Sequence, residues 1–211
     1  MVYCVHGHEV SQQAAATLHS AGIDAGFLQG GIHAWQAQTL PLAVKAAGSS
    51  TRWVTRERPK VDRIACPWLV RRFVDAEASF LYVTPGQVAS TAEREVATPF
   101  DVAPHLAETL FTHDGEQCSF DAFIRQYRLG GDPALSRLAE IVRAADTDRL
   151  AQTPQAAGLL ALSLGMSRLM ADDHDMLEAM MPMYDALYAW CQEAVTGQDE
   201  KHNWKPEGPA A

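Results

Sequence analysis

The N-terminal residues place a cysteine and two histidines in one short loop. In the segment VYCVHGHEVS (residues 2–11), an apolar run reaches Cys4 and a helix start follows. Backbone N–H groups of such a loop, together with the N-terminus of the next helix, converge on the sulfur and favour its thiolate. The segment therefore predicts a nucleophilic thiol at Cys4, with His6, Gly7 and His8 as the other members of a catalytic loop.

A second group of side chains has the composition of a metal site. A tight turn brings His113, Glu116 and Cys118 close together, and all three are metal-ligating residue types. A closed site needs a fourth ligand, which Asp146 or Asp148 could supply from the end of a later helix. The sequence thus predicts a candidate site for a single transition metal at His113, Glu116, Cys118 and Asp146. The alternative is that His113 caps the turn and Cys118 fills the core.

These groups must be positioned by helices and short strands. Apolar residues spaced three and four apart predict a helix over residues 61–73, with a restart at Pro67 that places Cys66 at a helix entry. Residues 110–113 read as a strand, and Ser119 reads as the N-cap of a helix. Further helix starts are predicted at Asp132-Pro133, at Thr153-Pro154 and at Asp172.

Composition excludes several classes of protein. The chain has 211 residues, of which 47% are hydrophobic and 20% charged, as in a folded soluble protein. No apolar run could span a bilayer and no signal peptide begins the chain, which favours the cytoplasm and no membrane partner. Four widely spaced cysteines indicate reduced thiols rather than a disulfide framework. The net charge of −9 argues against broad attraction to nucleic acid.

Charge and small residues divide the chain into parts. Small residues at 46–51 predict a linker between an N-terminal domain at residues 1–45 and a second domain at residues 52–196, with a flexible polar tail at residues 197–211. The second domain opens with RWVTRERPKVDRIACPWLVRRF (residues 52–73), which holds seven of the chain's 17 Lys and Arg residues. A local basic patch is therefore expected within an acidic protein.

The N-terminal domain resembles the C-terminal half of a rhodanese domain. The cysteine loop, the turn-and-helix motif GGIHAW (residues 30–35) and their spacing carry this resemblance. It implies a truncated βαβα segment and a sulfurtransferase in which Cys4 carries a persulfide from a sulfur donor. Many such loops also carry an arginine or lysine, which this loop lacks, so an inactive remnant is the alternative. The cut edge of the sheet would favour a homodimer.

The second domain resembles the chromate resistance protein family (ChrB type, C-terminal domain). The motifs that carry the resemblance are RWVTR (52–56), KVDRIACPWL (60–69), RRF (71–73), FDV (100–102) and THDGEQCSF (112–120). The resemblance implies a helix-rich α+β domain and a chromate-responsive regulator or accessory factor. The overall fold class expected is therefore α/β, a rhodanese-like βαβα segment followed by this domain.

Chromate is a tetrahedral dianion, so a protein that binds it needs arginine forks or clustered N–H groups. The candidate oxyanion-binding residues are Arg52, Arg56, Arg63, Cys66, Arg71 and Arg72. At a helix entry the Cys66 thiolate would be favoured and could reduce the anion. The alternative is that these arginines form ordinary surface salt bridges, each contributing less than ~1 kcal/mol.

Three functions follow from these observations. The leading one is chromate or oxyanion resistance, and the second is sulfur transfer through Cys4, which requires the missing half of the rhodanese fold. The third is a DNA-binding repressor of a resistance operon, whose affinity would fall with salt.

Overall fold

The structure is a computed structural model that describes residues 1–38, 40 and 51–197. Its N-terminal segment contains two helices, α1 (Glu9–Ser20) and α2 (Gly31–Ala37). The strands predicted on either side of α1 are reduced to a single parallel bridge between Val2 and Phe27, because a pair of strands without further neighbours is only marginally stable. The predicted linker, apart from Thr51, and the tail at 198–211 lie outside the described residues.

A small parallel sheet begins the rest of the fold. Strand β1 (Arg52–Arg56) lies between β2 (Ser79–Val83) and β3 (Thr98–Pro99). Three consecutive residues of β1, Trp53, Val54 and Thr55, are buried. Both faces of the central strand are therefore covered, as is usual for a parallel sheet.

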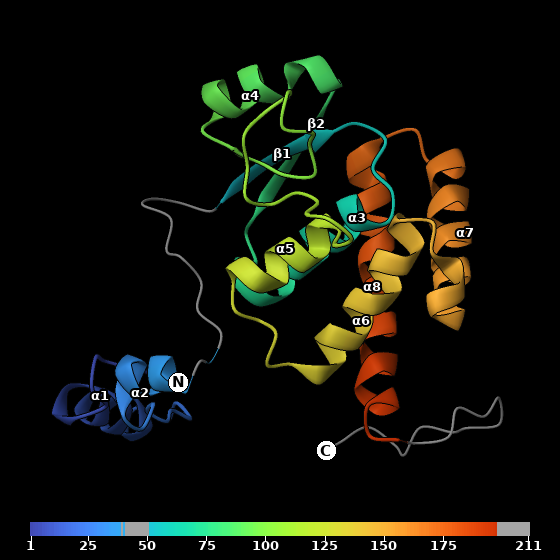
Figure 1. Cartoon of the computed structure of the whole chain (residues 1–211). Coiled ribbons are helices and arrows are strands. Elements are labelled where there is room, and N and C mark those ends of the chain that lie inside the picture. Colours follow the sequence, from blue (N-terminus) through green and yellow to red (C-terminus); the bar gives the residue numbers. More distant parts are fainter. Residues whose placement is uncertain (39, 41–50, 198–211) are drawn as a thin grey trace.

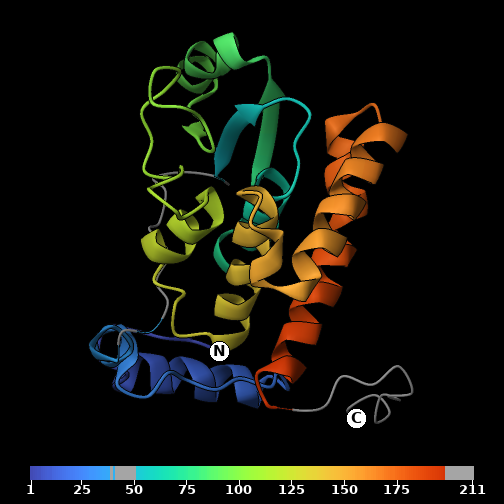
Figure 2. The same ribbon diagram turned by 45° about the vertical axis from the view of Figure 1, so that its right-hand side comes forward.

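Helices lie on both sides of this sheet. Helix α4 (Val88–Glu95) packs on β1 at one side, and α3 (Asp62–Leu69) and α5 (Ser119–Gln126) lie at the other (Figure 1). The remaining helices are α6 (Pro133–Asp146), α7 (Pro154–Leu169) and α8 (Asp173–Ala194), and α6 packs against both of the others (Figure 2). Short helical segments occur at Val70–Val74, Pro85–Gln87 and Leu150–Gln152. The predicted α/β class is confirmed.

Three predicted helix starts are confirmed. The Asp132 carboxylate accepts a hydrogen bond from the Leu135 N–H at 3.0 Å, at the start of α6. The Asp172 carboxylate accepts from the N–H groups of His174 and Asp175, at the start of α8. Thr153 directly precedes α7, whose first residue is the predicted proline.

Other expectations were wrong. Helix α3 passes through Pro67 and continues as a π-helix at Val70–Val74, so no helix restarts there. Residues 110–113 form no strand, because hydroxyl groups fold this segment back onto the end of β3 instead: the Thr109 hydroxyl donates to the Pro99 carbonyl at 2.6 Å. Ser119 is the first residue of α5, and Cys118 occupies the cap position.

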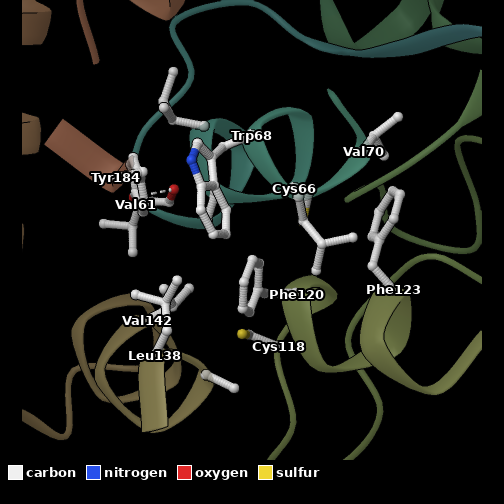
Figure 3. Close-up of a cluster of buried hydrophobic side chains, with 14 of the residues drawn as sticks. Val61, Cys66, Trp68, Val70, Cys118, Phe120, Phe123, Leu138, Val142 and Tyr184 are labelled. Atoms are coloured by element: carbon white, nitrogen blue, oxygen red, sulfur yellow. Dashed lines mark hydrogen bonds between the residues drawn. The ribbon is translucent and has the colours of Figure 1, made fainter. Parts of the chain in front are cut away.

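The main hydrophobic core lies between α3, α5, α6 and α8. Trp68, Phe120, Phe123 and Tyr184 are among its largest fully buried side chains (Figure 3). The hydroxyl of Tyr184 donates to the Val61 carbonyl at 2.8 Å, which joins α8 to the start of α3. None of the helices in the described part of the chain is long and apolar enough to cross a membrane.

Candidate functional site

Four segments far apart in sequence meet at one imidazole. Asp62 is the first residue of α3, Asp101 follows β3, His113 lies in the loop before α5, and Asp146 is the last residue of α6. The Nε2 atom of His113 is 3.3 Å from one carboxylate oxygen of each of the three aspartates. The arrangement is a single nitrogen faced by three carboxylates.

The cluster is buried on one side and open on the other. The side chains of Asp62 and Asp101 are only 2% and 5% exposed, whereas that of His113 is 41% exposed. Asp146 is intermediate at 17%. Small solutes can therefore reach the histidine, while the carboxylates behind it are shielded from water.

Two arginines and a serine fix the orientation of Asp101. Its Oδ2 atom is 2.9 Å from Nη2 of Arg56 and 3.1 Å from Nε of Arg63. Its Oδ1 atom accepts a hydrogen bond from the Ser119 hydroxyl at 2.8 Å, and the Ser119 N–H donates to Asp62 at 3.3 Å. One oxygen of Asp101 is thus turned to the arginines and the other to His113.

Burial and charge separate the two buried carboxyls. Burial, and then the neighbouring charge of Asp101, raise the pKa of Asp62. Burial would also raise the pKa of Asp101, but the hydrogen bond from His113 and the charges of Arg63 and Arg56 outweigh it and lower the pKa. The neighbouring carboxylates of Asp101, Asp146 and Asp62 raise the pKa of His113 to about 12. In the absence of a metal, His113 is the cation that holds these carboxylates together.

The backbone beside two of these residues is unusual. Val61, directly before Asp62, has φ 39° and ψ −101°, and Asp101 has φ 48°. A positive φ is tolerated by aspartate but is a genuine outlier for a β-branched residue such as valine. Such strain is held in place by surrounding contacts and concentrates at functional sites.

Half of the predicted metal ligands meet in this cluster. His113 and Asp146 are brought together, whereas Glu116 is 79% exposed and pairs with Arg149 at 3.0 Å. Cys118 is fully buried in the core, where burial raises the pKa of its thiol well above the ordinary value (Figure 3). The two residues that sequence reasoning missed are Asp62 and Asp101, although both stand inside the motifs KVDRIACPWL and FDV.

The predicted oxyanion-binding residues fall into separate places. Arg56 and Arg63 meet at Asp101, whereas Arg71 and Arg72 line one surface recess beside α8. Arg52 pairs with Glu95 at 3.5 Å at the surface. The expected basic patch is therefore largely neutralised by carboxylates within the fold.

Cys66 does not lie at a helix entry. Its side chain is fully buried within α3, and burial raises the pKa of its thiol well above the ordinary value (Figure 3). The prediction that a position at a helix entry would favour its thiolate was wrong, because the helix begins four residues earlier, at Asp62.

In the Cys4 loop, a backbone N–H and a hydroxyl group lie beside the sulfur. The Gly7 N–H donates to the Cys4 sulfur at 3.2 Å, and the Ser11 hydroxyl lies 3.3 Å from it. The hydrogen bond with Ser11 lowers the pKa of the Cys4 thiol to about 7, against the opposing effect of burial. Gly7 and Gly31 both have positive φ and approach each other so closely that a side chain on either would meet backbone atoms. The loop is therefore closed against the turn before α2.

Comparison with known proteins defines the family. Residues 53–191 match the family model described as ChrB, C-terminal domain. Over 139 residues the chain is 32% identical to Protein ChrB of Cupriavidus metallidurans (strain ATCC 43123 / DSM 2839 / NBRC 102507 / CH34), a match that covers 65% of this chain and 40% of that protein. The chain belongs to the ChrB C-terminal domain family, which confirms the predicted membership of the chromate resistance family.

The match to the ChrB family covers only part of the relative and part of this chain. The chain spans about 40% of the length of the curated relative. No solved structure matches it. All four residues of the His113 cluster lie within the matched segment, whereas the Cys4 loop lies outside it.

Proposed function

We propose that this chain acts in chromate resistance as a chromate-responsive regulator or accessory factor in the cytoplasm, and that it binds the anion at the recess formed by Arg71 and Arg72. Membership of the ChrB family supports the biological role. The observation that supports this recess is that two guanidinium groups reach one surface hollow. Its other lining residues are Ala76, Glu77, Ala78, Glu178 and Met181. A tetrahedral dianion is suited to two such groups.

The contacts within the recess leave donors for a ligand. Arg71 uses Nη1 for Glu178 at 2.6 Å and Nε for the Ala78 carbonyl. Arg72 uses Nε and Nη2 for a bidentate pair with Asp185, both at 2.8 Å. Among the described residues, neither Nη2 of Arg71 nor Nη1 of Arg72 has a hydrogen-bond acceptor, so one donor of each arginine remains for an anion.

Calorimetric titration of the reduced protein with chromate tests this proposal. Saturable binding that sulfate displaces is expected, and Arg71→Gln/Arg72→Gln should weaken it at least about tenfold, because charge-assisted hydrogen bonds to both groups are lost. Arg137→Gln is the matched control, since within the described part of the chain Arg137 pairs only with Glu140, at the surface of α6. Absence of saturable binding, or equal binding by the double variant, would contradict the proposal.

A specific observation favours sulfur transfer as a second candidate. In this proposal the Cys4 thiolate attacks the outer sulfur of a thiosulfate-like donor; a sulfur–sulfur bond forms at Cys4 while the donor's bond breaks and sulfite leaves. The hydrogen bonds from Gly7 and Ser11 support the thiolate that this step needs. Cys4→Ala should abolish the mass gain of one sulfur atom on incubation with thiosulfate, and a gain that persists in this variant would contradict the proposal.

The pH dependence of alkylation measures the ionisation of the Cys4 thiol. Because the pKa of Cys4 is lowered to about 7, its thiolate is largely formed above that pH and lost below it. We expect the rate of iodoacetamide alkylation to rise with pH around a midpoint near 7 and Ser11→Ala to move the midpoint upward. The fully buried thiols of Cys66 and Cys118 should not react in the folded protein. A midpoint near the ordinary value of about 8.5 would contradict the expectation.

The contacts of the arginines do not support DNA binding as the function. The arginines of the predicted basic segment contact carboxylates or carbonyl groups of the fold; Arg58, for example, donates to the Met170 and Ala171 carbonyls and pairs with Asp173. A surface that is neutralised in this way offers little net charge to phosphates.

A further inference from the structure

We propose that Asp62, Asp101, His113 and Asp146 form a site for one divalent transition-metal cation of the manganese or iron class. This site is independent of the chromate proposal, because it lies at the start of α3 and the end of α6 rather than in the Arg71–Arg72 recess. It shares only His113 and Asp146 with the site predicted from the sequence.

The distances from the His113 nitrogen to the three carboxylates are those expected between ligands of one cation, and they are longer than hydrogen bonds. One imidazole N–H can point at one acceptor, yet three carboxylate oxygens lie 3.3 Å from the same nitrogen. Hydrogen bonds from a charged nitrogen to a carboxylate are usually about 2.7–2.9 Å long. Ligands that each lie about 2.1 Å from a metal are about 3.0–3.4 Å from one another in octahedral or tetrahedral geometry. The three separations measured from the His113 nitrogen fall in that range.

Three of the ligand atoms converge closely. One ligand atom each from Asp62, Asp101 and His113 lies within 4.8 Å of the others, so a single cation can contact all three. Asp146 lies outside this close group but approaches the same His113 nitrogen from the end of α6. It would complete a set of one nitrogen and three oxygens.

Asp62 provides an independent reason to expect a cation. Its side chain is 2% exposed, and its neighbour Asp101 carries a like charge. Among the described residues, its only hydrogen-bond donors are the Ser119 N–H at 3.3 Å and His113. A buried carboxylate without strong partners is costly, and such groups are normally paired or coordinate metals. Asp62 points into the cluster, where a cation would satisfy it.

The donor set indicates the class of cation. Carboxylates suit manganese and magnesium, and imidazole suits iron, zinc and copper, so one imidazole with three carboxylates is best matched by Mn²⁺ or Fe²⁺. The three buried thiols, Cys66, Cys118 and Cys191, stand outside the set, which removes the soft ligands typical of structural zinc sites. The exposed side of His113 leaves room for water or a further ligand on the metal.

The residues around the ligands have the form expected of a metal site. Arg56 and Arg63 hold one oxygen of Asp101, and Ser119 contacts both Asp101 and Asp62. Hydrogen bonds of this kind orient metal-ligating carboxylates. The ligands would therefore be positioned before a metal arrives, and little reorganisation would accompany binding.

Metal analysis of the purified full chain tests this proposal. After incubation with Mn²⁺ and removal of the excess, about one Mn²⁺ per chain is expected, with loss of the free-ion electron paramagnetic resonance signal on titration. His113→Gln should weaken Mn²⁺ binding more than about tenfold, the lower end of the loss seen when even supporting residues of metal sites are changed. Asp62→Asn should do the same, and Fe²⁺ added anaerobically should compete with Mn²⁺.

Glu116→Gln is the matched control. It removes a carboxylate from the same loop that contacts Arg149 rather than the cluster, so Mn²⁺ binding should be unchanged. Circular dichroism of each variant separates loss of metal binding from loss of the fold. His113→Gln is the main test because His113 is the most exposed ligand of the four. No retained Mn²⁺ or Fe²⁺ in the parent chain, or equal affinity in a folded His113→Gln variant, would overturn the proposal and leave protonated His113 in the place of the metal.

Discussion

Replacing Trp68 by alanine is expected to lower the free energy of unfolding by about 4 kcal/mol. The indole is 1% exposed and packs against Phe73, Tyr184 and Tyr188, with ring centroids 5.5–6.2 Å apart. Its N–H also donates to the Asp185 carboxylate at 2.7 Å. Truncation removes this packing, opens a cavity between α3 and α8 and deletes the hydrogen bond. Urea denaturation at neutral pH measures the change.

A matched pair of variants separates cavity formation from the lost hydrogen bond. Trp68→Phe retains much of the packing but loses the donor to Asp185, so a smaller loss is expected. Leu169→Ala is the surface control, because Leu169 is 82% exposed and its truncation should change the free energy by less than about 0.5 kcal/mol. A loss below about 1.5 kcal/mol in Trp68→Ala would contradict the role of this side chain as a centre of the core.

Arg143→Ala is expected to cost about 3 kcal/mol of folding free energy. Arg143 donates to both oxygens of Asp121, at 2.6 and 2.8 Å, and the Asp121 side chain is 8% exposed. Removing the arginine leaves a buried carboxylate whose remaining hydrogen-bond donor, among the residues that the structure describes, is the Cys118 N–H at 3.0 Å. The cost arises mainly from that unpaired charge. Thermal or urea unfolding of the variant measures it.

The same helix provides the control. Arg137→Ala removes an exposed pair with Glu140 and should cost less than about 0.5 kcal/mol. The double variant Arg143→Ala/Asp121→Ala should be less destabilised than the sum of its single variants, since neither charge is then left alone. Strict additivity would show that the Arg143–Asp121 pair contributes little.

This pair also links the stability of α5 to the His113 cluster. Asp121 holds the N–H of Cys118 at the start of α5, and the next residue, Ser119, holds Asp101 and Asp62. Asp146 ends the helix that carries Arg143. Arg143→Ala is therefore expected to loosen two supports of the cluster without removing any of its members.

Local sequence signals predicted the helices better than the loops. Asp132 and Asp172 marked helix starts because the capping hydrogen bond is formed within three residues of the cap. Residues 110–113 carry a strand-like composition, but the hydroxyl groups of Thr109 and Thr112 donate to backbone carbonyls ten residues earlier. Propensity is outweighed there by tertiary contacts, which no local pattern contains.

The candidate site was only half predictable for the same reason. His113 was visible as a ligand type beside a turn, and Asp146 as a carboxylate at a helix end. Asp62 was not predicted as a ligand, because nothing in its local sequence indicates that it is buried beside Asp101. Cys118 and Glu116 were close to His113 in sequence, but the helix start turns the thiol into the core and leaves the glutamate at the surface.

The four members of the His113 cluster come from segments spread over residues 62–146, and this gives the cluster a consequence for the lifetime of the protein. A cation held by all four binds only the folded chain, so the free energy of unfolding rises with the concentration of free metal, by about 2.7 kcal/mol at a hundred times the dissociation constant. The population of unfolded chains available to proteases falls accordingly. With the proposed cation bound, metal supply would set how long each copy of the protein survives in the cell.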